Sequence, residues 1–332
     1  MRKQMAVVIL VGCALGIHIG YAALSGSTGQ ARSAVQKIII DTDIGGDIDD
    51  AFAVALALQS PEFEILGITT AWGDTTLRAR LLSRFLKETG RTDIPVAIGM
   101  VKHPPGGRDT LTQARYAEAT PEGQIYPNAS DFLLEQIRQY PGEITLIVIG
   151  PETNIAAAID QDATTFRNLK RVIVMGGSVY RGYDKDNGVN SEPSAEYNIA
   201  MDPPAAKKLF SSGVPLYLMP LDSTQIKLQL VRRSQLVSAG TPVTDQITLL
   251  YCQWSPGCNG TPTLFDPVAV AYAVRPDLCP TKAMRLHVDD KGYTRVESGE
   301  PNVQVCLSSN ADQFLDFLIP RLVGAPVAKS KR

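Results

Sequence analysis

The feature that most constrains the fold of this chain is an alternation of short apolar runs with amphipathic stretches at helical spacing. The predicted strands are Lys37–Ile40, Glu64–Thr70, Ile94–Ile98, Ile144–Ile149, Arg171–Met175 and Pro215–Met219. The predicted helices are Asp50–Gln59, Thr75–Glu88, Ala129–Gln139, Asn154–Ile159 and Pro203–Phe210. Strands that alternate with helices form βαβ units. We therefore predict a single Rossmann-like α/β domain, with a mostly parallel central sheet flanked by helices.

The domain is predicted to span residues 36–325, and the region from about 225 to 300 is less regular, with helices and a small extra hairpin. In open α/β sheets, ligands bind beyond the carboxyl ends of the strands. Polar residues that follow the apolar runs are therefore the candidate site residues.

The N-terminus has the pattern of a targeting segment. A basic start is followed by the apolar stretch Met5–Ala23, which ends near small residues at Gly20-Tyr21-Ala22. This predicts a signal peptide over residues 1–22 and a polar linker over 23–35, hence a secreted or periplasmic protein. The alternatives are an uncleaved membrane anchor and lipidation at Cys13, since Leu10-Val11-Gly12-Cys13 resembles a lipobox. No later segment is long and apolar enough to span a bilayer.

Composition excludes several partners. The chain has 332 residues, 44% of them apolar, and a net charge of −2 without a basic stripe. We therefore expect no nucleic-acid polymer as partner, no membrane contact after signal cleavage, and a small substrate.

Four cysteines lie beyond the signal segment, and export would allow them to form disulfides. Three pairings are possible, of which Cys252 with Cys258 and Cys279 with Cys306 is preferred. A zinc site is the rival interpretation, but no paired Cys-x-x-Cys or nearby histidine supports it.

The most specific local pattern is a cluster of five aspartates between Asp41 and Asp50, where a predicted strand leads into a helix. Helix capping accounts for one or two of them. Two carboxylates about 4 Å apart near a protein surface repel by about 4 kcal/mol, and a hard cation such as calcium converts that repulsion into coordination. The alternative is a solvated acidic turn. The spacing is not that of an EF-hand.

A metal ion beside a spare carboxylate favours hydrolysis. The metal lowers the pKa of a water molecule, and the carboxylate accepts its proton. The cluster by itself does not say which bond is hydrolysed.

At this point the sequence resembles a known family. The segment Asp41-Thr42-Asp43-Ile44-Gly45-Gly46-Asp47-Ile48-Asp49-Asp50-Ala51 is similar to the N-terminal signature of nucleoside hydrolases, Asp-x-Asp-Pro-Gly-x-Asp-Asp-Ala, with two extra residues. Further matches follow in the family's order along nearly the whole chain after residue 36. They are Ile68–Asp74, Gly150–Ala156, Val174–Gly177, Ala195–Asn198 with Asp202-Pro203, Met219–Asp222 and Phe265–Ala269.

The resemblance implies an N-glycosyl hydrolase that cleaves ribonucleosides to ribose and free base, and that acts as a homodimer or homotetramer. It implies one calcium ion held by Asp43, Asp50, Asp266 and the backbone carbonyl of Thr153. Asp43 would also deprotonate the calcium-bound water. Contacts to the ribose hydroxyls are carried over to Asp49, Asp74, Asn190, Glu196 and Asn198, with Asn190 assigned only from its spacing to Glu196, and Met175 is a substrate contact at the pocket floor.

Several of these residues have structural alternatives. Asp74 stands where many members carry asparagine and could simply form a turn, Met175 could pack in the core, and Glu196 and Asn198 could be surface residues. Asp47 lies in the two-residue expansion. It could be a metal ligand, a residue that supports the ligands, or part of a solvated turn. Asp41 is expected to support its neighbours by hydrogen bonding, and Asp222 to be structural.

The main departure from the family is Phe265. Many members have histidine there, placed to help the base leave, and phenylalanine cannot donate a proton. Either another residue supplies the acid, with Tyr183, Tyr251, Trp254 and His103 as candidates, or the base is activated by stacking or by protonation from solvent. Purine or pyrimidine preference therefore stays open.

Two other functions compete. A haloacid-dehalogenase-like phosphatase would share the Asp41-Thr42-Asp43 strand end but leaves the later motifs unexplained. A non-catalytic exported nucleoside- or sugar-binding protein would keep the pocket without turnover.

Overall fold

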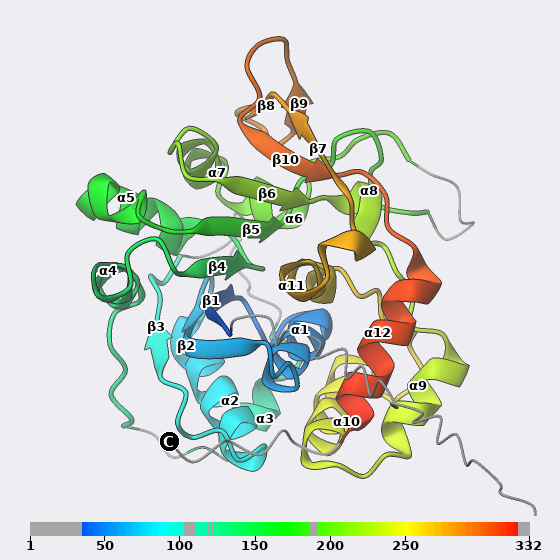
Figure 1. Ribbon diagram of the computed structural model, residues 1–332. Helices are drawn as coiled ribbons and strands as arrows, with labels where there is room; N and C mark the ends of the chain where they lie inside the picture. The colour runs from blue at the N-terminus through cyan, green and yellow to red at the C-terminus, as the bar shows by residue number, and fades with distance from the viewer. Residues whose placement is uncertain (1–34, 103–110, 119, 121–122, 186–190, 325–332) are drawn as a thin grey trace, which may run out of the picture. The chain divides into compact units, whose positions relative to one another are not determined.

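The computed structural model describes residues 35–102, 111–118, 120, 123–185 and 191–324 (Figure 1). The predicted signal peptide (1–22), nearly all of the linker (23–35), Cys13, His103 and Asn190 lie outside these residues, so those predictions stay untested. Residues Ala34–Arg332 form one compact unit. Among the described helices, none is long and apolar enough to cross a membrane.

The central sheet has eight strands among the described residues, in the order β3-β2-β1-β4-β5-β6-β10-β7. All neighbouring pairs are parallel except β10 and β7. This confirms the predicted α/β class with a mostly parallel sheet. The strands are β1 (Gln36–Thr42), β2 (Phe63–Thr70), β3 (Val96–Ile98), β4 (Thr145–Val148), β5 (Arg171–Met175), β6 (Leu216–Met219), β7 (Thr281–Met284) and β10 (Val303–Cys306).

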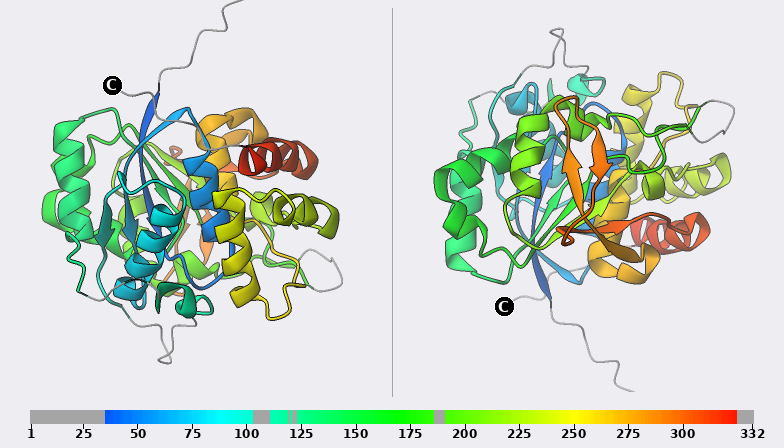
Figure 2. Two further views of the ribbon diagram at one scale, coloured as in Figure 1. Left: turned by 90° about the horizontal axis from the view of Figure 1, so that it is seen from below. Right: turned by 90° about the horizontal axis from the view of Figure 1, so that it is seen from above.

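Two layers of helices cover the two faces of the sheet (Figure 2). One layer contains α4 (Ala129–Gln139), α5 (Thr153–Phe166) and α7 (Pro203–Phe210). The other contains α1 (Asp49–Leu58), α2 (Thr75–Glu88), α10 (Pro242–Trp254), α11 (Asp266–Val274) and α12 (Ala311–Val323). The shorter elements are α3 (Ala114–Glu118), α6 (Tyr197–Met201), α8 (Leu221–Thr224), α9 (Leu230–Val237) and the 3₁₀ turn η1 (Pro276–Leu278).

The strands are apolar on both faces because each face is covered. In β1, Ile38 and Ile40 pack toward α1 and α11, whereas Ile39 between them packs toward α4 and α5. This alternation follows from the two-residue period of a strand. It explains why the predicted strands read as continuous apolar runs.

The irregular region folds as helices followed by a hairpin, as predicted. Strands β8 (Leu286–Val288) and β9 (Thr294–Val296) form an antiparallel pair on either side of a turn at Asp289–Gly292. The cysteines pair as preferred from the sequence, Cys252 with Cys258 and Cys279 with Cys306.

Candidate active site

A pocket of about 420 Å³ opens beyond the carboxyl ends of β1, β4 and β5. It is lined by Asp43, Gly46, Asp47, Asp49, Asp50, Arg78, Thr112, Ile149, Met175, Tyr183, Glu196, Tyr197, Asn198, Trp254, Phe265 and Asp266. The volume suits a small molecule. The parallel sheet thus brings sequence motifs from both halves of the chain to one place.

Three buried carboxylates form one end of the pocket. Asp49 and Asp50 begin α1, Asp266 begins α11, and these two helices pack against each other. One carboxylate oxygen of each residue lies within 4.8 Å of the others. Because each residue is at most 4% exposed, burial raises the pKa of all three carboxyls well above the usual value, and the neighbouring carboxylates raise it further.

Local structure fixes these carboxylates. Both helix N-termini point their positive dipole ends at the cluster, which favours negative charge there. The Thr42 hydroxyl donates to Asp50 Oδ1 at 2.5 Å, and the Asp266 N–H donates to Asp49 Oδ2 at 3.3 Å. Close, buried oxygen ligands of this kind fit a hard divalent cation, which would remove the cost of burying three like charges.

Asp43 lines the same pocket but is not part of this closest group of three oxygens. Its backbone is held in place from two sides. Arg78 donates hydrogen bonds to the carbonyl oxygens of Asp43 and Ile44. A Cβ at Gly150 would approach the Asp43 nitrogen to 2.8 Å, so only glycine leaves room for this turn.

Asp41 and Asn154 support the site from behind. The amide nitrogen of Asn154 donates to Asp41 Oδ1 at 2.8 Å and to the Thr70 carbonyl at 3.0 Å. Thr69 donates a second hydrogen bond to Asp41 Oδ1. Asp41 therefore has the supporting role expected from the sequence, since it ties β1 to β2 and to the start of α5.

Glu196 and Asn198 form the wall that faces these carboxylates. The Glu196 carboxylate accepts hydrogen bonds from the N–H groups of Gly177 (2.9 Å), Asn198 (3.0 Å) and Ile199 (3.2 Å). Burial raises the pKa of the Glu196 carboxyl to about 7, although these bonds oppose the shift. Asn198 donates to the carbonyl of Met175, which also lines the pocket. The structure thus places both residues inside the site rather than on the surface.

The structure does not bring every predicted site residue to the pocket. Asp74 is exposed, caps α2 by accepting from the Leu77 N–H at 2.9 Å, and is not among the lining residues. Thr153 begins α5 and donates its hydroxyl to Asp202, and it is not among the lining residues. The ligand and ribose roles assigned to these residues stay predictions.

Sequence reasoning missed three residues that shape the site. Arg78 is 1% exposed on the otherwise apolar face of α2, and an arginine within such a stripe was the available signal. Thr112 donates its hydroxyl to the Gly46 carbonyl at 2.5 Å and so braces the two-residue expansion. Glu152 is fully buried, its pKa is raised by burial, and both its oxygens lack a hydrogen-bond partner among the described residues.

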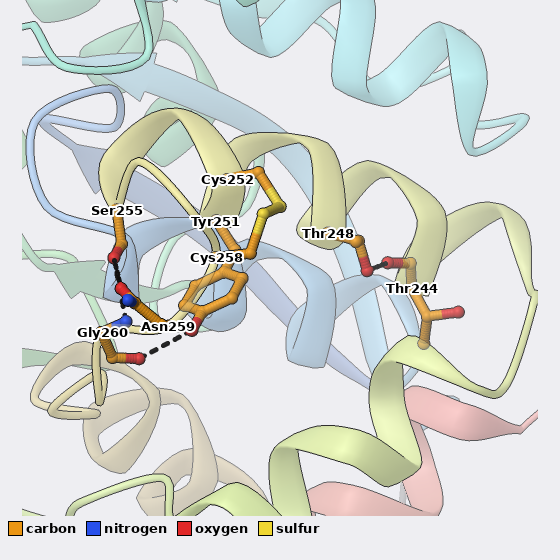
Figure 3. The surroundings of a disulfide bond; sticks show 8 residues. All are labelled: Thr244, Thr248, Tyr251, Cys252, Ser255, Cys258, Asn259 and Gly260. Carbon is orange, nitrogen blue, oxygen red and sulfur yellow. Dashed lines mark hydrogen bonds between the residues drawn. A yellow bond between two sulfur atoms is a disulfide. The ribbon is translucent and has the colours of Figure 1, made fainter.

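Aromatic side chains form a second part of the pocket lining, called the aromatic end below. The rings of Tyr183 and Phe265 meet edge to face, with centroids 6.2 Å apart and planes at 82°. Trp254, at the end of α10, lies near the Asp47 carboxyl and opposes the rise of its pKa that burial causes. The disulfide Cys252–Cys258 closes the loop that follows this helix end, and Tyr251 donates to the Gly260 carbonyl at 2.7 Å (Figure 3).

Comparison with known proteins agrees with this geometry. The family model for inosine-uridine preferring nucleoside hydrolase matches residues 38–316. Uridine nucleosidase 1 of Arabidopsis thaliana is 33% identical, with 82% of this chain and 81% of that protein covered. The pyrimidine-specific ribonucleoside hydrolase RihA of Citrobacter koseri is 31% identical, with 86% and 97% covered.

Solved structures give the same result. A plant nucleoside hydrolase superposes with a TM-score of 0.75 at 26% identity, covering 87% of this chain and 99% of that one. A purine-preferring ribonucleoside hydrolase from Gardnerella vaginalis gives 0.71 at 26% identity, covering 87% and 98%. These matches define the class of protein as an N-glycosyl hydrolase with an α/β fold. The chain belongs to the nucleoside hydrolase family, which replaces the phosphatase alternative.

Proposed function

We propose that this protein is an exported, calcium-dependent hydrolase that converts ribonucleosides to ribose and free base. One observation carries the proposal. The buried group Asp49, Asp50 and Asp266 shares a single pocket with Asp43 and with the Glu196–Asn198 wall. The ion and the ribose would therefore be held side by side.

Calcium is favoured by the chemistry of the ligands. The group offers only hard carboxylate oxygens, and no cysteine or histidine is among the described residues that line the pocket. Asp50 and Asp266 lie in the group, while Asp43 and the Thr153 carbonyl are the further ligands that the family resemblance implies. When bound, calcium supplies a Lewis-acid centre that orients a water molecule and lowers its pKa.

The side chains then divide the reaction between them. Asp43 accepts the proton of the attacking water as its oxygen bonds to the anomeric carbon. Asp49, Glu196 and Asn198 accept from or donate to the ribose hydroxyls, and Met175 packs beneath the sugar. Asp74 and Asn190 are kept as outer ribose contacts on the resemblance alone. Contacts that strengthen as the sugar gains oxocarbenium character lower the barrier rather than merely binding substrate.

A nucleoside panel tests this function directly. Release of reducing sugar should occur from at least one of uridine, cytidine, inosine and adenosine. Uridine is tried first because the relatives include a uridine nucleosidase and a pyrimidine-specific ribonucleoside hydrolase. Chelation should abolish release and added calcium should restore it, with one calcium per chain by elemental analysis. Tight nucleoside binding without sugar release would instead indicate the non-catalytic binding protein. A stoichiometric transition metal would contradict calcium.

Export is supported by the N-terminal sequence and by the two disulfides, since disulfides persist mainly outside the cytoplasm. Sequencing the N-terminus of the mature protein should find it near Ala23. Soluble cytoplasmic protein that retains residues 1–20 would refute export. The homodimer or homotetramer is proposed from the family resemblance, and light scattering measures it.

A further inference from the structure

The pocket poses a chemical question at its aromatic end. When the bond between ribose and base breaks, its electron pair passes to the base, and a hydrogen-bond donor placed there lowers the barrier. Phe265 stands next to Asp266 and has no polar hydrogen. Another donor must therefore serve a base that leaves from this end.

Most donors in the pocket are already committed to other groups. Thr112 donates to Gly46, Asn198 to Met175, and Arg78 to the carbonyls of Trp72 and Ile44. These bonds hold the walls of the pocket, and using them on a base would dismantle the walls.

Tyr183 differs from these residues. Its phenol oxygen accepts the Tyr197 N–H at 2.9 Å, so its own hydrogen must point elsewhere. Among the described residues, none accepts that hydrogen. The phenol oxygen lies beside the backbone of the Glu196–Asn198 wall, while the ring contacts Phe265 edge to face. It is thus positioned between the ribose wall and the aromatic end.

The loop that carries Tyr183 is held on both sides. The Gln225 side chain donates to the Gly182 carbonyl at 3.0 Å and accepts the Asp184 N–H at 2.6 Å, so one amide clamps both peptide groups that flank Tyr183. Upstream, the Asp222 carboxylate accepts the N–H groups of Val179 (2.9 Å) and Tyr180 (2.8 Å). Asp222 is therefore structural, as expected, and the phenol is pre-organised.

We propose that the Tyr183 hydroxyl is the catalytic hydrogen-bond donor to the departing base, in the place that Phe265 cannot fill. The role rests on the proposed nucleoside hydrolysis. The bond from the anomeric carbon to the base nitrogen breaks, and its electron pair stays on the base. The phenol donates a hydrogen bond to the negative charge that develops on that base. The base later takes its proton from solvent, while Asp43 holds the proton of the attacking water.

The environment of the phenol fits a donor that keeps its proton. Burial raises the pKa of the Tyr183 hydroxyl, and the negative charge of Glu196 raises it further. The hydroxyl therefore remains protonated at working pH. Because it is a weak acid, it stabilises the leaving base by hydrogen bonding rather than by full proton transfer.

The test compares two leaving groups in purified protein with calcium present. Tyr183→Phe keeps the ring and removes only the hydroxyl. Its kcat/KM for the best nucleoside of the panel should fall about 10- to 100-fold, the loss expected for one hydrogen bond to a charged group. For nitrophenyl riboside, whose leaving group is already stable, the fall should be less than about threefold. Tyr180→Phe is the matched control, because Tyr180 lies in the same loop, outside the pocket lining, and both rates should be unchanged.

Two further variants separate chemistry from loop structure. In the Tyr183→Phe background, Phe265→His should raise kcat/KM for the nucleoside at least about tenfold, because an imidazole again supplies a hydrogen-bond donor. Gln225→Ala removes the clamp, so Gln225 is a positioning residue. Gln225→Ala should lower kcat/KM more for the nucleoside than for nitrophenyl riboside. This difference should vanish when the substitution is made in the Tyr183→Phe background.

The outcomes are distinct. Equal losses on both substrates for Tyr183→Phe would overturn the proposal and indicate a ribose contact or a loop defect. An unchanged nucleoside rate would overturn it as well. A wild-type protein that releases ribose from neither substrate would overturn the proposed function itself, and with it this role.

Discussion

The two ends of the pocket are built by different means. At the carboxylate end, Asp43, Asp49 and Asp50 come from one short segment, and buried strands and helix starts hold them. At the aromatic end, Tyr183, Trp254 and Phe265 come from three separate segments, held by a glutamine clamp, a disulfide and a ring contact. In the proposed mechanism, residues that follow the first strand of the sheet activate water, while residues from three separate segments meet the base.

This difference bears on base preference, which varies among the relatives by their names. The relatives include uridine-, pyrimidine- and purine-directed enzymes on one fold. Loop residues change more readily than residues buried under a sheet, because loop substitutions disturb little packing. The comparison predicts that damage at the carboxylate end affects every substrate, whereas damage at the aromatic end depends on the leaving group.

The largest effect is expected from Asp43→Asn, which is nearly isosteric but a poor base. General-base catalysis contributes about 10²–10⁴-fold, so hydrolysis should fall by that amount on nucleosides and on nitrophenyl riboside alike. Steady-state kinetics measures the loss, and elemental analysis checks that calcium is retained. Near-normal hydrolysis with calcium bound would show that Asp43 is not the base.

A pH effect of intermediate size is expected from Glu196. Its carboxyl has a pKa of about 7 in the folded protein against 4.5 for the ordinary group. Between these values the folded state binds more protons than the unfolded state, so the free energy of unfolding should fall as pH rises from 4.5 to 7. The loss from this group is at most about 3 kcal/mol. Urea unfolding at pH 5 and pH 7.5 should show a shallower pH dependence in Glu196→Gln than in wild type. Equal slopes would place the titration elsewhere.

The smallest effect is expected from the double variant Cys252→Ala, Cys258→Ala. Closing a short loop contributes only about 2 kcal/mol, but Trp254 lies within the closed segment. Nucleoside hydrolysis should fall a few-fold, and nitrophenyl riboside hydrolysis should hardly change. The matched control is Cys279→Ala with Cys306→Ala, which removes a disulfide with no residue in the pocket lining and should cost stability without changing this ratio. If both double variants change the ratio of nucleoside to nitrophenyl riboside hydrolysis equally, the effect reflects a general loss of stability and not the position of Trp254.

Much of the fold was predictable because its signals are local. The six predicted strands and five predicted helices all correspond to observed elements, although β1 extends to Thr42 and α5 runs on to Phe166. The pattern could not place β7 and β10, since these four-residue strands contain polar residues and lack a long apolar run. The disulfide pairing preferred from the sequence also agrees with the structure.

The site was predictable where residues stand in dense motifs. Glu196 and Asn198 lie in the pocket wall as the motif indicated, and the aspartate cluster lies at its predicted strand end. Asp49 was assigned to ribose, yet the structure groups it with Asp50 and Asp266, because the first turn of α1 directs both neighbours toward α11. Spacing along the chain could not show that.

By itself the sequence determined the elements, the layers they form and the presence of an acidic site, because periodicity and clustered charge act over a few residues. Only the tertiary structure decided which distant groups meet. The Asp266 N–H reaches Asp49 across 217 residues, and Tyr183 meets Phe265 through a loop that Gln225 holds. Such contacts depend on how α1, α11 and the loop that carries Tyr183 pack together beyond the strand ends, and no local sequence pattern predicts that packing.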